Sequence, residues 1–155
     1  MKETFDLIPG RRASLYLAGT VLGLALLGGC TAEESDRFVI TGNATYDGKP
    51  IPAGELVFTP DTSRGNKGPQ GKAKIVDGKF TTRGDGRGVV GGPHRVELRA
   101  FDGVAFQDAE MMVEEGRPLF GSLKGNIDLP SDSAVIDAHV TTQGGKSQMT
   151  LSLVP

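Results

Sequence analysis

Alternation of apolar and charged residues is the feature that most restricts how this chain folds. In residues 94–100, one histidine and three apolar residues occupy every second position, separated by Arg95, Glu97 and Arg99. An extended strand points successive side chains to opposite faces, so this order produces one apolar and one charged face. Residues 71–76 repeat the pattern with two lysines at the alternate positions. The pattern predicts antiparallel strands that are buried on one side.

Turn residues interrupt these strands at short intervals. The chain has 23 glycines and 9 prolines among 155 residues, a composition that favours many tight turns over long helices. The pairs Asp47-Gly48 and Asp77-Gly78 tolerate the positive φ values of hairpin turns, and Asp102-Gly103 ends a strand. The length fits one domain with a short appendage. The predicted fold class is therefore all-β.

Seven or eight short strands are expected in residues 38–155, and they predict a β-sandwich. The expected strands are residues 40–46, 55–59, 71–76, 79–82, 94–100, 127–129, 134–140 and 148–154. One segment, residues 105–115, favours a helix, with Phe106, Ala109 and Val113 on one side and Gly116 as a C-cap; a loop is the alternative. Residues 60–71 and 83–93 are rich in glycine and are expected to form exposed connections.

The N-terminus has the layout of a secretory signal. Residues 1–12 carry Lys2, Arg11 and Arg12, and residues 13–27 follow without any charge. As a helix this apolar run is roughly 22 Å long, which is shorter than the roughly 30 Å hydrocarbon core of a membrane. We therefore expect a signal-peptide helix that is removed during export.

Leu27-Gly28-Gly29-Cys30 looks like a bacterial lipobox, in which the cysteine is acylated and becomes the new N-terminus. The alternative is an ordinary signal with a chance cysteine. The predicted organisation is a signal peptide in residues 1–29, a lipidated Cys30 with a polar spacer in residues 30–37, and a domain in residues 38–155. Two or more acyl chains, such as palmitate, are needed for stable anchoring. Thr31 stands where an aspartate would mark retention at the inner membrane, so the resemblance implies the outer membrane, on its periplasmic or surface side.

Composition argues against several classes of protein. The chain has 17 basic and 19 acidic residues and a formal net charge of −2, so it lacks the positive excess that follows a phosphate backbone, and nucleic acid is not an expected partner. A single cysteine is too few for a disulfide framework or a cysteine-rich zinc site. The chain contains no GxSxG motif, and its one thiol is assigned to lipid.

The two histidines are the remaining candidates for chemistry. His94 falls on an apolar face, which favours a structural imidazole bonded to the backbone. His139 shares a polar face with Asp137, a pair that suits a metal, although a surface coincidence is the favoured interpretation. No metal or cofactor is expected. An envelope enzyme with a site near His94 or His139 is the least favoured function.

Four stretches resemble small planctomycete-type bacterial lipoproteins with a carboxypeptidase-regulatory-like, transthyretin-like domain. They are residues 39–51 (VITGNATYDGKPI), 55–68 (ELVFTPDTSRGNKG), 88–96 (GVVGGPHRV) and 101–103 (FDG). The resemblance implies a Greek-key sandwich of prealbumin type without known catalysis. An enzymatic branch of that fold ends in Tyr-Arg-Gly-Ser, whereas this chain ends in Leu-Ser-Leu-Val-Pro. Residues 141–155 extend beyond the family pattern and predict an extra strand.

The predicted function is a non-enzymatic binding or structural module of the cell envelope. Its partner is expected to be an envelope protein or a glycan, bound through the loops of residues 60–71 and 83–93 because strand positions are committed to packing. The candidate binding residues in these loops are Asp61, Arg64, Lys67, Asp85 and Arg87. A carbohydrate-binding accessory domain is the alternative, although the chain has no tryptophan and its only tyrosines are Tyr16 and Tyr46.

Overall fold

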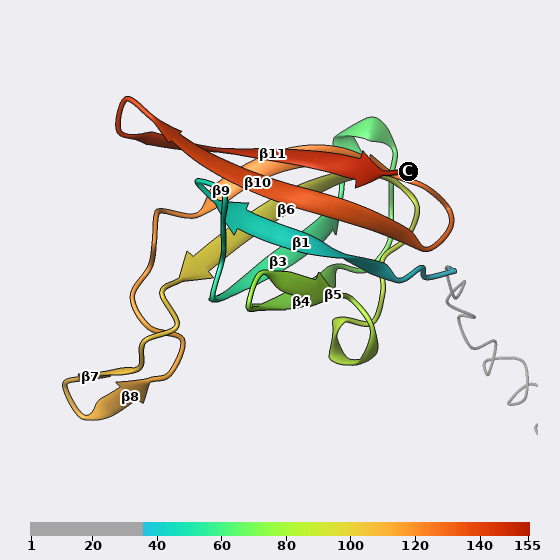
Figure 1. Ribbon diagram of the computed structural model, residues 1–155. Coiled ribbons are helices and arrows are strands. Elements are labelled where there is room, and N and C mark those ends of the chain that lie inside the picture. Colours follow the sequence, from blue (N-terminus) through green and yellow to red (C-terminus); the bar gives the residue numbers. More distant parts are fainter. Residues whose placement is uncertain (1–35) are drawn as a thin grey trace, which may run out of the picture. The chain divides into compact units, whose positions relative to one another are not determined.

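The alternating segments form a single curved sheet. Figure 1 shows the computed structural model, which describes residues 36–155. The predicted signal-peptide helix and the lipidated Cys30 lie outside the described residues. The elements are β1 (Ile40–Tyr46), β2 (Lys49–Pro50), β3 (Ala53–Pro60), β4 (Gly71–Val76), β5 (Lys79–Thr81), β6 (Gly92–Phe101), β7 (Phe106–Asp108), β8 (Met111–Val113), β9 (Leu123–Leu129), β10 (Ala134–Gln143) and β11 (Lys146–Val154). The only helical pieces described are two short 3₁₀ turns, η1 (Thr62–Arg64) and η2 (Gly84–Gly86), so the all-β prediction is confirmed.

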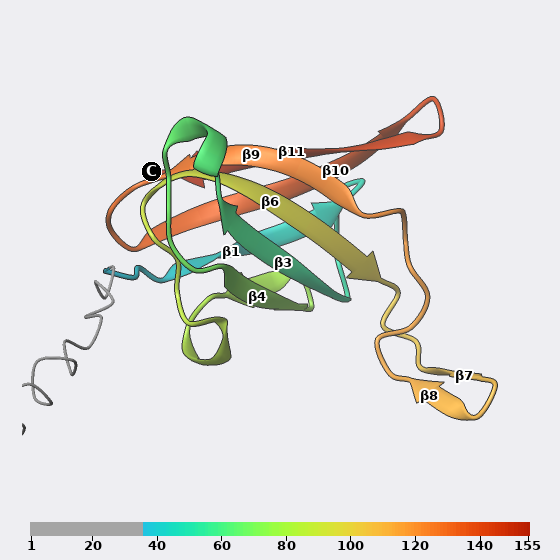
Figure 2. The same cartoon turned by 180° about the vertical axis from the view of Figure 1, so that it is seen from behind.

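The strands follow the order β11-β10-β1-β5-β4-β3-β6-β9, and β2 pairs with β1. All pairs are antiparallel except β1 with β10. The two ends of this sheet meet, because β9 packs against β11 (Figure 2). At the contact, a Cβ on Gly125 would lie 3.0 Å from Met149 Cε and 3.4 Å from Leu151 Cδ1. The sheet is therefore a nearly closed barrel.

The Asp-Gly pairs make the tight turns that they predict. Asp47 and Gly48 have φ values of 48° and 80°, and Asp77 and Gly78 have 48° and 74°. Two successive positive φ values match the right-handed twist of the flanking strands. Asp77-Gly78 joins β4 to β5 as expected, and Asp47-Gly48 joins β1 to the short β2.

The inward face of the barrel holds the hydrophobic core. Leu56, Phe58, Ile75 and Leu98 are fully buried, and they come from three adjacent strands. Burying side chains of this size contributes about 1.5–3 kcal/mol each. The alternation seen in the sequence therefore correctly identifies the face of each strand that packs inside.

Residues 105–115 form a β-hairpin, so the helix prediction is wrong. Ala109 has a φ of 51°, a left-handed conformation that a helix interior does not accommodate. Phe106 lies opposite Val113 across the hairpin, so the turn between the two strands brings together residues that a helical period of 3.6 would also place on one side. Gly116 is not a helix C-cap, and its φ of 87° lets the backbone approach Asp102.

The extra C-terminal strand exists. β10 continues to Gln143, and β11 pairs antiparallel with it along its whole length. The register places the start of β1 and both glycine-rich loops at one end of the barrel, called the N-terminal end. The β7–β8 hairpin and residues 117–122 lie at the other end, called the distal end (Figure 1). In the described residues, no helix has the length and apolarity that a membrane span requires.

Candidate functional site

The two loops predicted to bind a partner are in direct contact. The backbone N–H of Asp61 donates to the carbonyl of Pro93 at 2.9 Å. The Asn66 amide donates to the carbonyls of Gly91 and Pro93 at 3.0 and 2.8 Å. The structure thus brings residues 60–71 and 83–93 together at the N-terminal end, as a single surface.

Asp61 holds this surface together, and it is not an exposed loop residue. Asp61 is only 7% exposed. Its Oδ1 accepts hydrogen bonds from the Ser63 N–H at 3.1 Å, from the Ser63 hydroxyl at 2.6 Å and from Arg95 Nη2 at 2.7 Å. The hydrogen bonds from Ser63, and then from Arg95, lower the pKa of Asp61 below its ordinary 3.8. The prediction of an exposed connection is wrong at Asp61, because its carboxylate caps η1 by accepting a hydrogen bond from the Ser63 N–H.

The other four candidates are exposed but do not converge on one point. Arg64 forms an ion pair with Asp128 of β9 at 2.9 Å. The carbonyl of Arg87 accepts a hydrogen bond from Arg37 Nη1 at 3.1 Å, close to the start of β1. Lys67 and Asp85 are exposed. This surface therefore adjoins the segment through which the chain enters the barrel.

His94 is a structural residue, as its place on the apolar face predicts. It is 1% exposed, and its Nδ1 lies 2.9 Å from the carbonyl of Gly92. A carbonyl only accepts, so Nδ1 is the donor, and in the neutral ring Nε2 is then the nitrogen without a proton. Nε2 has no hydrogen-bond partner among the described residues. Burial lowers the pKa of His94 below its ordinary 6.5.

His139 and Asp137 each form a hydrogen bond with a residue of the neighbouring strand β1. The Nδ1 of His139 lies 2.8 Å from the hydroxyl of Thr45, and Asp137 accepts a hydrogen bond from the Asn43 amide at 2.9 Å. In residues 36–155 no group of three or more His, Cys, Asp or Glu side chains is placed to hold a metal.

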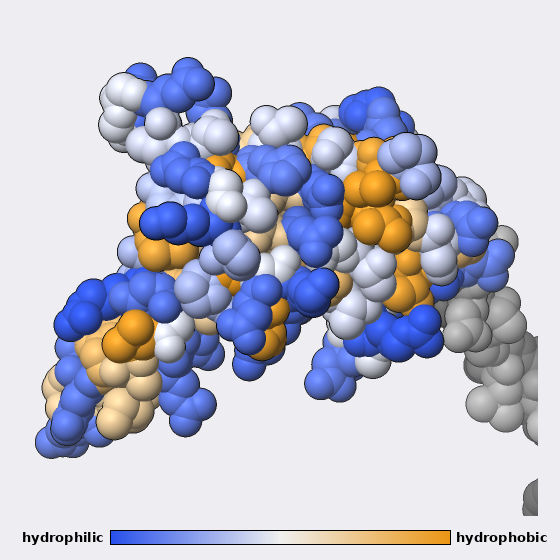
Figure 3. Space-filling view, in the orientation of Figure 1, coloured by the Kyte–Doolittle hydropathy of each residue, from blue (hydrophilic) through white to orange (hydrophobic). Residues whose placement is uncertain are grey.

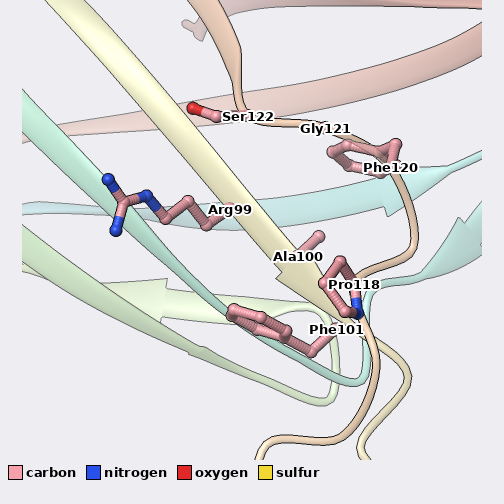
Figure 4. Close-up of a pocket in the computed structure, with 7 residues that line it drawn as sticks. All are labelled: Arg99, Ala100, Phe101, Pro118, Phe120, Gly121 and Ser122. Atoms are coloured by element: carbon pink, nitrogen blue, oxygen red, sulfur yellow. The ribbon is translucent and has the colours of Figure 1, made fainter.

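A pocket that sequence reasoning missed lies at the distal end. Its volume is about 340 Å³, and its walls come from the end of β6 and from residues 118–122 (Figure 4). The hydrogen bond from the Leu119 N–H to the Ala100 carbonyl, at 2.9 Å, holds these two segments together. The lining residues are Arg99, Ala100, Phe101, Pro118, Phe120, Gly121 and Ser122. The sequence predicts a strand at residues 94–100, which includes Arg99 and Ala100, but it gives no sign that residues 118–122 lie against its end, because the two segments are far apart in the chain.

The polar edge of this pocket is held in place by Glu97. One carboxylate oxygen accepts from the Ser122 hydroxyl at 2.9 Å and from Arg99 Nε at 3.0 Å. The hydrogen bond from Ser122, and then the one from Arg99, lower the pKa of Glu97. The ionised carboxylate fixes Arg99 at the rim, where Figure 4 shows its guanidinium directed away from the pocket's Pro118 wall.

A second pocket of about 320 Å³ adjoins the first and shares Arg99 and Phe101 with it. Its other walls include Glu55, Lys74 and Glu115. Together the two pockets combine the aromatic side chains of Phe101 and Phe120 with charges of both signs. Such a surface can hold a ligand that has one apolar face and several polar groups.

The fold and this site define an all-β domain, built as a nearly closed barrel with an apolar-walled pocket at its distal end. No family model matches the chain, and no curated protein or solved structure matches it either.

Proposed function

We propose that the chain is an exported, lipid-anchored envelope protein whose β-domain is a non-enzymatic binding module. One observation carries the proposal: the chain enters β1 at the N-terminal end, and the pockets lie at the distal end. Residues 31–37 reach only about 25 Å when fully extended. A lipid on Cys30 would therefore hold the N-terminal end near the membrane and leave the distal end open to a partner.

The proposal includes a Greek-key domain of prealbumin type, related to carboxypeptidase-regulatory-like domains. The strand order β6-β3-β4-β5 supports it. Three consecutive strands lie side by side, and the fourth returns to lie beside the first, which is the arrangement of a Greek key.

The lining of the distal pocket suits a polar ligand that has an apolar face, such as part of an envelope protein or a glycan. Phe101 supplies an aromatic surface, and Arg99 supplies donors at the rim. The Ser122 hydroxyl donates its proton to Glu97, so toward a ligand it offers an acceptor oxygen. The carbohydrate-binding alternative depends on the Phe101 ring and the Arg99 donors. Tyr46 does not serve as a sugar platform, because its ring packs edge-on against Phe120 at 5.1 Å and its hydroxyl lies 3.1 Å from Thr142 Oγ1.

The loop surface at the N-terminal end is the competing binding surface, through Arg64, Lys67, Asp85 and Arg87. The enzyme alternative near His94 or His139 has less support, since a His94 that is 1% exposed does not meet a substrate.

One experiment separates the two surfaces. Gly121 lines the pocket, and a Cβ built on it meets nothing within 4 Å, so we expect Gly121→Trp to be accommodated and to add an indole beside the pocket. Binding of purified envelope glycan and of purified envelope proteins is measured by isothermal titration calorimetry. We expect Gly121→Trp to weaken binding at least tenfold. Thr150→Trp, on an exposed position of β11, is the matched control and should bind as the wild type does.

The alternative surface is tested in the same assay by replacing Arg64, Lys67 and Arg87 with alanine. If this triple variant loses binding and Gly121→Trp does not, the distal pocket is the wrong site.

A further inference from the structure

The β7–β8 hairpin is separate from the barrel. It forms a two-stranded sheet of its own and projects from the distal end (Figures 1 and 2). Among the described residues, the hydrophobic core and the apolar side chains packed against it include none from residues 104–115. Packing of the barrel therefore does not account for this segment.

The hairpin exposes large apolar side chains. Met111 is 73% exposed, Met112 is 61% exposed, and Val104 at the base is 62% exposed. Adjacent residues on a strand point to opposite faces, so each face of the ribbon carries one methionine. Figure 3 shows the apolar surface of this projection enclosed by hydrophilic residues. Methionine is flexible and polarisable, and it suits contacts with varied partner side chains.

The base of the hairpin is held in position. The Gly103 N–H donates to the Glu115 carbonyl at 3.0 Å, and the Asp102 N–H donates to the Arg117 carbonyl at 2.9 Å. The guanidinium of Arg117 lies 4.5 Å from the centre of the Phe106 ring. These contacts pre-organise the ribbon, which reduces the ordering that a partner must impose.

The charge of the hairpin selects among partners. Its acidic residues are Asp108, Glu110, Glu114 and Glu115, all of them exposed, and residues 104–116 contain no lysine or arginine. Arg117, at the base, lies over the Phe106 ring, so four carboxylates face one cation. A second copy of the chain would set an equal group of carboxylates against this one, and an anionic lipid surface would be repelled in the same way. A basic partner is attracted, and its cations complement the carboxylates around the methionines.

We infer that the β7–β8 hairpin is a docking element for a basic, extended segment of a partner protein, which adds as a third strand to the open edge of β8. β7 and β8 pair only with each other in the described part of the chain, and β8 is the strand that carries both methionines. Its outer edge therefore presents backbone donors and acceptors to an incoming strand. Met111 and Met112 contact apolar side chains of that strand, and the carboxylates pair with its lysines or arginines. This inference does not depend on the lipid anchor.

The probe is a synthetic decapeptide of alternating lysine and valine, labelled with fluorescein. Its binding to the full chain, purified in a neutral detergent, is measured by fluorescence anisotropy. We expect saturable binding. The affinity should fall at least tenfold between about 50 and about 500 mM salt, because salt screens the attraction between the peptide's lysines and the carboxylates of the hairpin. A decapeptide of alternating glutamate and valine should not bind. N-methylation of alternate residues in the lysine peptide should abolish binding, because it removes the donors of an added strand.

Two double variants locate the site. Met111→Ser with Met112→Ser should weaken binding at least tenfold, and Glu110→Gln with Glu114→Gln should weaken it and flatten the salt dependence. The matched controls, Val76→Ser and Val135→Ser, change exposed apolar residues on the barrel and should leave binding unchanged.

Equal binding by the methionine variant, or by the N-methylated peptide, would overturn the inference. It would also be overturned if the methionines were required for a dimer of the chain or for binding phosphatidylglycerol vesicles, and not for binding the peptide. The peptide-binding assay does not require the lipid on Cys30. Failure of the docking inference is therefore distinguishable from failure of the proposed lipid anchor.

Discussion

The carboxylate of Asp102 accepts a hydrogen bond from the backbone N–H of Arg117 at 3.0 Å. The same oxygen accepts from the N–H of Val104 at 2.9 Å. The Asp102 side chain, directly after β6, thus joins the segment that leads into the β7–β8 hairpin to the segment that leads out of it. This contact sets the position of the hairpin.

Asp102→Ala should loosen the hairpin and leave the barrel folded. Losing hydrogen bonds to a charged acceptor costs about 1–3 kcal/mol, so amide exchange in residues 104–116 should accelerate about tenfold or more. Hydrogen exchange followed by NMR measures this effect. Asp102→Asn keeps an acceptor oxygen and should show a smaller change. Faster exchange throughout β3 and β6 would contradict the assignment of a local role.

Stability should depend on the protonation of His94. Its pKa is lowered on folding because the ring is buried, so the unfolded chain binds this proton more readily than the folded one. The free energy of unfolding should therefore be highest above pH 6.5 and decrease as the pH falls below 6.5 toward the folded pKa. Urea unfolding at pH 7 and pH 5 measures the decrease.

His94→Leu should reduce this decrease, whatever its effect on stability at pH 7. His139→Ala, at an exposed position, is the control and should keep the dependence of the wild type. An equal decrease for wild type and His94→Leu would show that another group is responsible.

Asp61→Ala should lower the melting temperature at neutral pH. The hydrogen bonds from Ser63 and Arg95 lower the pKa of Asp61 below 3.8, so the stabilisation is present above pH 3.8 and is lost as the pH falls toward the folded pKa. Thermal unfolding of wild type and variant should therefore differ at pH 7 and converge in strong acid. Asp85→Ala changes an exposed carboxylate in the adjoining loop and should have little effect at either pH. A difference that grows with acidity would refute the ion-pair argument.

Cys30→Ser should prevent acylation and release the protein from the membrane fraction. The prediction follows from the lipobox-like sequence, because the thiol is the nucleophile that forms the thioether. Mass spectrometry of the wild type should show an acylated peptide beginning at Cys30, and no peptide from residues 1–29. An intact N-terminus on the mature wild-type protein would rule out the processing step.

Local patterns predicted those features that depend on neighbouring residues. The alternation in residues 94–100 identified the buried face of β6, with Val96 and Leu98 inside. Asp77-Gly78 identified a hairpin because its two φ values are a local requirement of that turn. His94 was correctly placed as a backbone-bonded core residue by its position on the apolar face.

The hairpin at residues 105–115 shows where local patterns fail. Phe106, Ala109 and Val113 fit a helical face, yet Phe106 and Val113 pair across a turn. The choice is decided by Asp102 and Gly116, which close the base of the hairpin. The hydrogen bond between Asp102 and Arg117 spans 15 residues, and no periodic pattern in the sequence between them indicates it.

Sequence by itself determined the all-β class, the strand faces and the Asp-Gly turns, because side-chain direction and turn geometry are set within a few residues. Only the tertiary structure decided that β9 meets β11 to nearly close the barrel. It also decided that Asp61 is engaged by Arg95, and that residues 118–122 complete a pocket with Arg99 and Phe101. Each of these depends on the register and curvature of the whole sheet, which bring together residues that do not influence one another along the chain.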